Sequence, residues 1–252
     1  MSEFNTIITG TGRCGTGYFA ALLNSMNLNC GHESIFDVCG LERAKDRISG
    51  RQPISLSCTC GESPSCKETC MSVVLKDVDK NNLVADSSYL AAPFLDDDFF
   101  KKYNFIHILR NPISVIKSFV QVVDYFKDDF PEHSRPFQNF IKKYLKDVYD
   151  NDFSQADRGY LYYFGWNKMI LEKIKNRNHI VYKVEENNEN KILNFLGKEN
   201  CDFSLKNEKI NHWQNRNEEE DLDFNVFKKE VEELILKYRE GEGYGEMFSH
   251  GF

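Results

Sequence analysis

The chain has 252 residues, of which 41% are hydrophobic and 28% are charged, and its formal net charge at pH 7 is -7. A chain of this length can bury a full core, and it predicts a single domain over residues 1–252. The negative net charge argues against a general nucleic-acid surface, so a small anionic ligand would need a local basic site. Because no apolar run approaches 18 residues and the N-terminus has no leader-like pattern, the sequence predicts a cytoplasmic protein without a membrane partner.

The first predicted element is a buried strand over residues 6–9, which leads into a glycine-rich loop and then a helix. An apolar stripe with the i, i+3, i+4, i+7 spacing indicates the helix, and it consists of Phe19, Leu22, Leu23 and Met26. Glycines allow successive backbone N–H groups to point at one anion, and the positive end of the following helix strengthens the attraction. The pattern predicts an anion-binding loop; the alternative is a tight strand-to-helix turn.

This loop departs from the nucleoside triphosphate motif G-x-x-x-x-G-K-[ST]. Gly10 and Gly15 have the spacing of that motif, but Thr16 and Gly17 stand in place of its lysine and its Mg²⁺-binding hydroxyl. The cation that this loop carries is Arg13. The sequence therefore predicts an anion site that works without a metal.

A second short strand is predicted to end near residues 31–34. It would place His32 and Glu33 at the carboxyl edge of the sheet, where ligands of open α/β sheets bind. Either side chain is a candidate general base for a bound hydroxyl group. The alternative is an exposed loop pair or a helix cap.

Residues 37–80 are predicted to form an insertion or a cap over the site. They contain a cluster of four cysteines, Cys58, Cys60, Cys66 and Cys70. Their spacing differs from the paired C-x2-C of most structural zinc sites, although four close thiolates can hold Zn²⁺. A structural zinc site, a redox-dependent bridge and unpaired thiols all remain open.

Another strand is predicted over residues 82–86, with an Asp-Ser-Ser turn at its carboxyl end. Asp86 and Ser87 would then lie on the ligand side of the sheet. The alternative is that one of these two side chains caps the next short helix.

The next strong signal is a central strand from Phe105 to Leu109, followed by Arg110 and a helix. Pro112 suits the first turn of that helix, and the apolar face of the helix is predicted to consist of Val115, Ile116 and Phe119. Arg110 lies at the exit of the strand, and Ser118 lies two turns into the helix. A guanidinium and a hydroxyl placed in this way can hold one phosphate from two sides.

Together, the two segments resemble sulfotransferases that use 3'-phosphoadenosine 5'-phosphosulfate (PAPS), and the position of Glu33 makes the chain look closer to the carbohydrate and heparan type. In that family a basic glycine loop after the first strand binds the 5'-phosphosulfate, and an R-x-P-x5-S pattern after a later strand binds the 3'-phosphate. This sequence matches the first motif at residues 10–17 and the second at Arg110, Pro112 and Ser118. The resemblance implies a three-layer, P-loop NTPase-like α/β fold with a central parallel sheet flanked by helices. It also implies the product 3'-phosphoadenosine 5'-phosphate (PAP) and no required metal.

The resemblance further implies the residues that bind the nucleotide. They are Gly12, Arg13, Cys14, Gly15, Thr16, Gly17, Tyr18, Arg110, Ser118 and, more faintly, Lys209. Lys209 stands where the family has a late loop that closes over the nucleotide, but the glycine-containing form of that loop is missing here. Helix 159–174 and strand 179–184 look like the last core elements of the family, and a peripheral helix is predicted near residues 227–238.

The family offers two patterns for the catalytic base. One is a histidine after the strand that corresponds to residues 82–86, where this chain has Asp86. The other is a glutamate soon after the first helix, where this chain has Glu33. Glu33 is therefore the first candidate for the base, with His32 and Asp86 as reserves, while Arg13 and the loop amides would stabilise the charge that develops on the sulfonate.

The predicted activity is transfer of a sulfuryl group to a hydroxyl or amine of a small-molecule or carbohydrate acceptor. One alternative is a P-loop kinase or NTPase, which the missing lysine argues against; another is a non-catalytic nucleotide-binding module. Tyr160, Tyr162 and Tyr163 belong to an aromatic-rich region that would either line an acceptor pocket or pack a helix. The sequence identifies neither the acceptor nor the oligomeric state.

Overall fold

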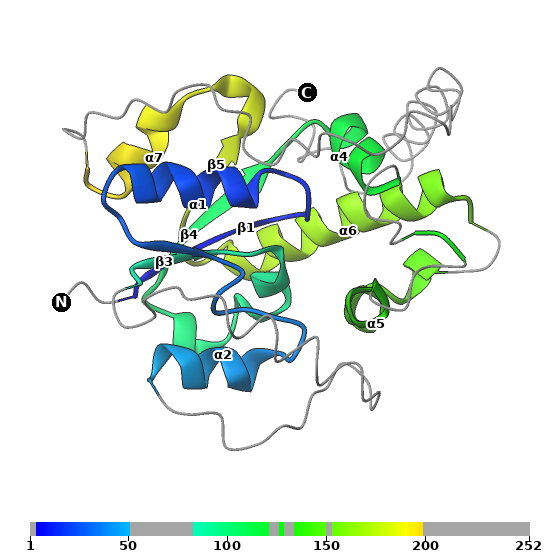
Figure 1. Ribbon diagram of the computed structural model, residues 1–252, viewed down its shortest axis with the longest axis horizontal. Helices are drawn as coiled ribbons and strands as arrows, with labels where there is room; N and C mark the ends of the chain where they lie inside the picture. The colour runs from blue at the N-terminus through cyan, green and yellow to red at the C-terminus, as the bar shows by residue number, and fades with distance from the viewer. Residues whose placement is uncertain (1–3, 51–82, 121–125, 129–133, 150–152, 199–252) are drawn as a thin grey trace.

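The computed structural model describes residues 4–50, 83–120, 126–128, 134–149 and 153–198. Its centre is a five-stranded sheet in the order β2-β3-β1-β4-β5, and every pair of neighbouring strands is parallel (Figure 1). The strands are β1 (Thr6–Gly10), β2 (Cys30–His32), β3 (Ala85–Ser87), β4 (Asn104–Leu109) and β5 (Asn178–Lys183).

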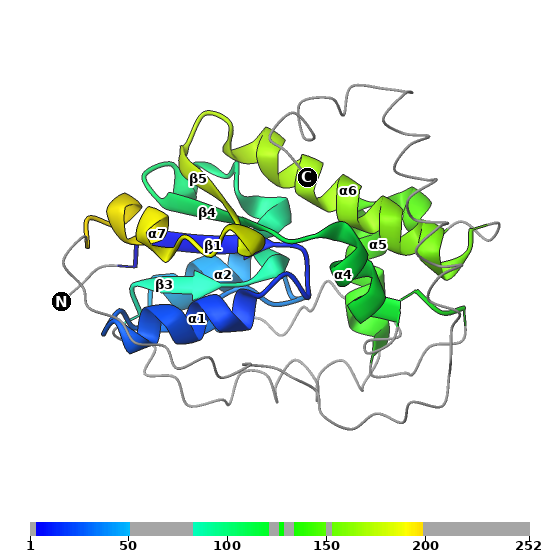
Figure 2. The same cartoon turned by 90° about the horizontal axis from the view of Figure 1, so that it is seen from above.

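Helices cover both faces of this sheet. The α-helices of the described residues are α1 (Thr16–Ser25), α2 (Leu41–Ile48), α4 (Pro112–Ser118), α5 (Arg135–Tyr144), α6 (Gln155–Ile174) and α7 (Glu189–Phe195). Short 3-10 helices are η2 (Tyr89–Phe94), η3 (Asp98–Phe100), η6 (Lys146–Tyr149) and η7 (Val184–Glu186). Figures 1 and 2 show α1 and α7 on one side of the sheet and α2 on the other. The predicted α/β fold with a central parallel sheet flanked by helices is confirmed.

The two central strands are buried on both faces, and isoleucine, leucine and phenylalanine provide most of their large side chains. All five residues of β1 are buried, and in β4 the run from Phe105 to Leu109 is buried as well. A parallel strand covered on both faces needs a continuous apolar run rather than an alternating one. This requirement explains why both strands were recognisable in the sequence.

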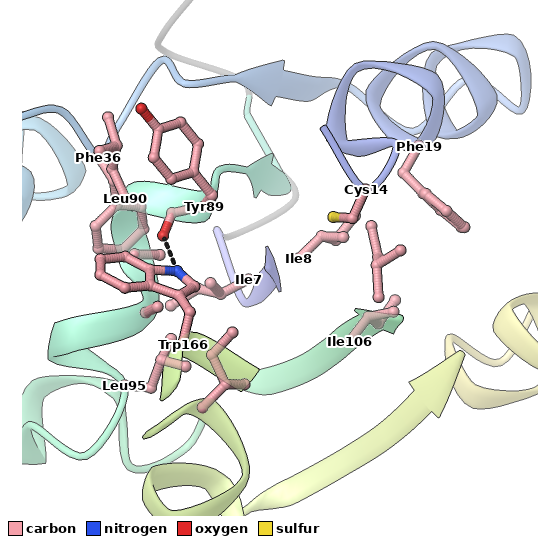
Figure 3. Packing of buried hydrophobic residues seen from close by; sticks show 14 of the residues in the cluster. Ile7, Ile8, Cys14, Phe19, Phe36, Tyr89, Leu90, Leu95, Ile106 and Trp166 are labelled. Carbon is pink, nitrogen blue, oxygen red and sulfur yellow. Dashed lines mark hydrogen bonds between the residues drawn. The ribbon is translucent and has the colours of Figure 1, made fainter. Parts of the chain in front are cut away.

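The core lies on both sides of β1. Figure 3 shows Ile7 on the side of Trp166, and Ile8 on the side of Cys14 and Phe19, as expected because successive strand side chains point to opposite faces. The indole N–H of Trp166 donates to the carbonyl oxygen of Tyr89 at 3.3 Å, which joins α6 to η2.

The strand order creates a switch point at the carboxyl ends of β1 and β4. After β1, the chain passes through α1 toward β2 and β3; after β4, it leads to β5 at the opposite edge. The two strands are in register, with Gly10 opposite Ile108. The glycine loop and Arg110 therefore leave adjacent strands at the same edge, in the place where ligands of such sheets bind.

The predicted helices agree closely with those observed. The apolar stripe of α1 is buried, with Met26 at its C-cap. α4 begins at Pro112 and ends at Ser118, and its predicted apolar face is buried. The residue that caps the short helix after β3 is Ser88, whose hydroxyl accepts the N–H of Leu90, rather than Asp86 or Ser87.

Several predictions concern residues outside the described ranges: the cluster Cys58, Cys60, Cys66 and Cys70, the nucleotide residue Lys209, and the helix near 227–238. Of the predicted insertion at 37–80, only 37–50 are described, and they contain α2. None of the described helices is long and apolar enough to cross a membrane.

Candidate functional site

The glycine loop after β1 is shaped by close backbone approaches. A Cβ atom at Gly10 would lie 2.5 Å from the carbonyl oxygen of Ile108 and 2.6 Å from the sulfur of Cys14, so no side chain fits there. Arg13 and Gly15 adopt left-handed backbone angles, with φ of 66° and 113°. These turns lead the chain directly into α1.

The start of α1 presents backbone N–H groups at the carboxyl edge of the sheet. Its N-cap is Gly15, which has no side chain to accept a hydrogen bond from this helix end. The first N–H groups of a helix have no partner within the helix and carry partial positive charge. Two earlier N–H groups of the loop are donated inside the protein, from Gly12 to the Tyr162 hydroxyl at 3.1 Å and from Cys14 to the Thr11 carbonyl at 3.3 Å. The turn that begins α1 is therefore the part of the loop that could bind an anion.

The second segment is the junction of β4 and α4. Asn111 caps α4, because its side-chain oxygen accepts the N–H of Ser114 at 3.2 Å. The backbone N–H of Asn111 donates to a carboxylate oxygen of Glu185, beyond the end of β5, at 2.7 Å. These contacts fix where Arg110 leaves the sheet.

The two predicted phosphate-binding segments touch each other. The Nη1 atom of Arg110 donates to the carbonyl oxygen of Arg13 at 3.0 Å, and the Nε atom of Arg13 donates to the Ser118 hydroxyl at 2.9 Å. Arg13 is separated from Ser118 by 105 positions in the sequence. The fold thus gathers two guanidinium groups and a hydroxyl beside the start of α1.

The hydroxyl groups of two consecutive tyrosines of α6, Tyr162 and Tyr163, contact the backbone of the two segments. Besides the contact of Tyr162 with Gly12, the Tyr163 hydroxyl donates to the carbonyl oxygen of Arg110 at 2.6 Å. Sequence reasoning assigned these residues to helix packing or an acceptor pocket. The sequence feature that could have indicated this role is the choice of tyrosine over phenylalanine. A buried tyrosine hydroxyl needs a hydrogen-bond partner, whereas phenylalanine needs none.

The end of β2 brings His32 and Glu33 to the same edge of the sheet. The Nε2 atom of His32 lies 3.2 Å from the Thr16 hydroxyl, at the first residue of α1, and 3.9 Å from a carboxylate oxygen of Glu33. The N–H of Glu33 donates to the carbonyl oxygen of Ser87 at 3.1 Å, and its φ is 55°. The side chains of His32 and Glu33 are 41% and 29% exposed, so both reach solvent at this edge.

Asp86 is buried beneath the turn that follows β2. Its two carboxylate oxygens accept the N–H groups of Ser34, Ile35 and Phe36 at 3.0, 3.2 and 3.4 Å. Burial raises the pKa of Asp86 to about 6, although these N–H groups and the charge of Arg47 oppose the shift. This carboxylate holds the backbone that carries His32 and Glu33.

Gly31 of β2 lies very close to the Asp86 and Ser34 side chains. A Cβ atom at Gly31 would lie 2.6 Å from the Oδ1 atom of Asp86 and 2.7 Å from the Ser34 side chain. The absence of a side chain at this position allows β2 and the following turn to close around the carboxylate.

Two other residues predicted to bind the nucleotide lie near the start of α1, with Cys14 just before the helix and Tyr18 in its first turn. Burial raises the pKa of the Cys14 thiol to about 12, so it stays protonated at neutral pH. The Tyr18 hydroxyl donates to Glu189 of α7 at 3.3 Å, and burial, followed by the Glu189 charge, raises its pKa. Tyr18 therefore joins α1 to α7.

The described part of the chain contains no group of three or more His, Cys, Asp or Glu side chains that could hold a metal ion. Besides His32 and Glu33, the polar groups that converge at the site are backbone N–H groups, guanidinium groups and hydroxyls. Such groups are donors, and they suit an anion.

The sequence matches no protein-family model and no curated protein sequence. Among solved structures, the chain is similar to a sulfotransferase from Alicyclobacillus acidocaldarius, with 15% sequence identity and a TM-score of 0.39. The similarity covers 93% of this chain and 96% of that chain. At this identity and TM-score the similarity carries no argument about function, which has to come from the site itself.

Proposed function

We propose that this chain is a PAPS-dependent sulfotransferase, which moves a sulfuryl group to a hydroxyl or amine of a small-molecule or carbohydrate acceptor. The observation that carries the proposal is the direct contact between the loop after β1 and the segment after β4. Arg13 contacts Ser118, and Arg110 contacts the backbone of Arg13, at the switch point of the sheet. A nucleotide with phosphate groups at two positions requires such a pair of adjacent donor sites.

The donor groups of the site fit this nucleotide. In our proposal, Arg13 and the N–H groups of Gly15 and Thr16 hold the 5'-phosphosulfate, while Arg110 and Ser118 hold the 3'-phosphate. Guanidinium groups are suited to such binding because their planar donors match phosphate geometry. The uncapped start of α1 adds backbone donors and partial positive charge.

The reaction requires an acceptor that loses a proton and a leaving group whose charge is stabilised. The acceptor oxygen or nitrogen forms a bond to sulfur, the bond between sulfur and the bridging phosphate oxygen breaks, and PAP leaves. We propose that Glu33 takes the acceptor proton, and that Arg13 with the α1 amides stabilises the negative charge on the sulfonate. His32 contacts Thr16 and lies beside Glu33, so it is the nearest reserve for the base.

Thermal unfolding tests this proposal against its two alternatives. At about a hundredfold excess over its dissociation constant, the true ligand stabilises the fold by about 3 kcal/mol. We expect PAP to raise the melting temperature and Mg²⁺-ATP to leave it unchanged. A rise with Mg²⁺-ATP alone would favour a kinase or NTPase, and a rise with PAP but no transfer to any acceptor would favour a binding module.

A matched pair of arginine variants makes the test specific to the site. Arg110→Ala should remove most of the shift caused by PAP, because the 3'-phosphate loses its guanidinium. Arg135→Ala removes an exposed arginine at the start of α5 and should keep the full shift. Equal shifts in both variants would contradict the assignment of Arg110.

A further inference from the structure

We propose that Tyr162 and Tyr163 are positioning residues, which hold the two nucleotide-binding segments in the geometry that receives the two phosphate groups. The inference rests on the proposed function and deepens it. It starts from the two hydroxyl contacts, because each tyrosine binds a different segment: Tyr162 binds Gly12 of the loop, and Tyr163 binds Arg110.

The two tyrosines are adjacent, yet they serve different segments because an α-helix turns by about 100° per residue. α6 packs against both β1 and β4, the strands that lead into the two segments. Both side chains are fully buried. A rigid helix thus presents two fixed hydroxyl groups, one to each segment.

The contacts form a closed circuit. Tyr162 binds Gly12, the next residue Arg13 accepts from Arg110, and Arg110 accepts from Tyr163. Because the circuit returns to α6, the two segments are positioned relative to the helix and relative to each other. Loss of either hydroxyl opens the circuit.

The loop is also confined at Gly12. A Cβ atom there would lie 2.8 Å from the Cζ atom of Phe119. The centroids of the Phe119 and Tyr162 rings are 5.1 Å apart. Gly12 is therefore held between an aromatic ring and a hydroxyl group. The hydrogen bond of its N–H group positions the loop. The later N–H groups of the turn are then directed toward the ligand.

The chemistry of the two hydroxyls suits these roles. The Tyr162 hydroxyl accepts from an N–H, and the Tyr163 hydroxyl donates to a carbonyl oxygen. Burial raises the pKa of Tyr163, so its hydroxyl keeps the proton that it donates. The Tyr162 ring packs against Phe119, Phe126 and Trp166, and phenylalanine at this position would keep those contacts.

The test uses Tyr162→Phe, Tyr163→Phe and the control Tyr160→Phe. Tyr160 is buried on the same helix, and it lines a cavity with Val148 and Phe164. All three changes remove only a hydroxyl group. Comparable melting temperatures for the three variants and the wild type would show that the fold persists.

The first measurement is binding of PAP and of adenosine 5'-monophosphate, which lacks the 3'-phosphate. We expect Tyr162→Phe to weaken both ligands by about five- to tenfold, because it frees the loop that holds the 5'-end. We expect Tyr163→Phe to weaken PAP by a similar factor and to leave the monophosphate unchanged, because it frees Arg110. A general loosening of the fold would instead weaken both ligands equally in both variants, and that result would overturn the proposal.

The second measurement needs no nucleotide and separates this inference from the proposed function. Amide hydrogen exchange should become faster around Gly12 in Tyr162→Phe and around Arg110 in Tyr163→Phe, with no change in Tyr160→Phe. If wild-type protein fails to bind PAP, the proposed function fails and exchange alone decides the positioning role. Faster exchange at these two places supports it, and exchange at wild-type rates in both variants overturns it.

Discussion

At the residue scale, Glu33 stands out because its backbone is constrained at a place where its side chain reaches solvent. Its left-handed φ of 55° is uncommon for a residue with a side chain. The hydrogen bond from its N–H to Ser87 holds it at the end of β2, beside His32. Strained backbone at a sheet edge that carries a carboxylate is typical of functional sites.

We predict that Glu33→Gln abolishes sulfuryl transfer, with a loss of at least about a hundredfold, because the amide cannot accept the acceptor proton. PAP binding should stay within about twofold of wild type, since Glu33 is not among the donors proposed for the nucleotide. Transfer from PAPS to a panel of phenolic and carbohydrate acceptors measures the first effect, and calorimetry with PAP measures the second. Glu172→Gln, an exposed change on α6, is the control; unchanged turnover in Glu33→Gln would move the base to another residue.

Asp86 supplies a second prediction, because its pKa in the folded protein is raised to about 6 from 3.8. The folded state therefore holds the proton more tightly than the unfolded state. The resulting stabilisation is present below about pH 4 and is lost as pH rises through 6. Relative to Asp86→Asn, wild-type stability should fall by about 3 kcal/mol between pH 4 and pH 7. Urea unfolding of both proteins across this range measures the difference, and a difference independent of pH would contradict the prediction.

The comparison with a variant is needed because His107 titrates in the same range with the opposite sign. Burial lowers the pKa of His107 to about 4 from 6.5, so the unfolded state takes up the proton first as pH falls. The stability from neutral His107 is present above about pH 6.5 and is lost toward pH 4. The two titrations offset each other in wild-type protein, whereas Asp86→Asn keeps His107 and leaves only the Asp86 effect in the difference.

At the element scale, α4 is the element that completes the nucleotide site. Asn111 and Pro112 define its start, and Ser118 is its last residue, where the hydroxyl meets Arg13. The helix is thus just long enough to carry Ser118 back to the loop. Its apolar face fixes its rotation against the core.

We predict that Ser118→Ala weakens PAP binding by about five- to tenfold and weakens adenosine 5'-monophosphate less, because the 3'-phosphate loses a donor whereas the 5'-site loses only the contact that orients Arg13. Alanine is a better helix former than serine, so the loss cannot come from unfolding of α4. Ser114→Ala removes a hydroxyl one turn earlier in the same helix and serves as the control. Equal PAP affinities of the two variants would contradict the role of Ser118.

At the scale of the whole molecule, α6 links the site to the core. It carries Tyr162 and Tyr163 toward the loops, and Trp166 toward η2, where the indole contacts Tyr89 (Figure 3). Because α6 is packed in the core, the loops that it contacts are held as rigidly as the core. The fold and the site are therefore stabilised by the same element.

We predict that Trp166→Ala lowers the free energy of unfolding by about 3–5 kcal/mol, because a fully buried ring is replaced by a cavity. This loss is a large part of the roughly 5–15 kcal/mol of a typical domain. Denaturant unfolding followed by circular dichroism measures it. Phe99→Ala, at a side chain that is 37% exposed, should cost much less; equal losses would contradict the central position of Trp166.

Much of the fold could be predicted because its signals are local. The apolar runs of β1 and β4 reflect burial on both faces, and the stripe of α1 reflects one buried helix face. The spacing of Arg110 and Ser118 could be interpreted for the same reason, because one short helix joins them. The roles of Asp86 and the α6 tyrosines could not be predicted. Their partners lie about 50 positions away for Asp86 and 150 away for Tyr162, and only the folded chain brings them together.

The sequence by itself determined the order of the five strands, the helices that follow β1 and β4, and the absence from the first loop of the lysine and hydroxyl that a Mg²⁺-nucleotide motif requires. These properties depend on residue type and short-range spacing. The tertiary structure alone decided that Arg13 meets Ser118, that Gly12 is held by Tyr162, and that Asp86 is buried under the turn after β2. Hydrogen bonds between distant segments depend on strand order and helix packing, which arise when the chain buries its apolar surface as a whole.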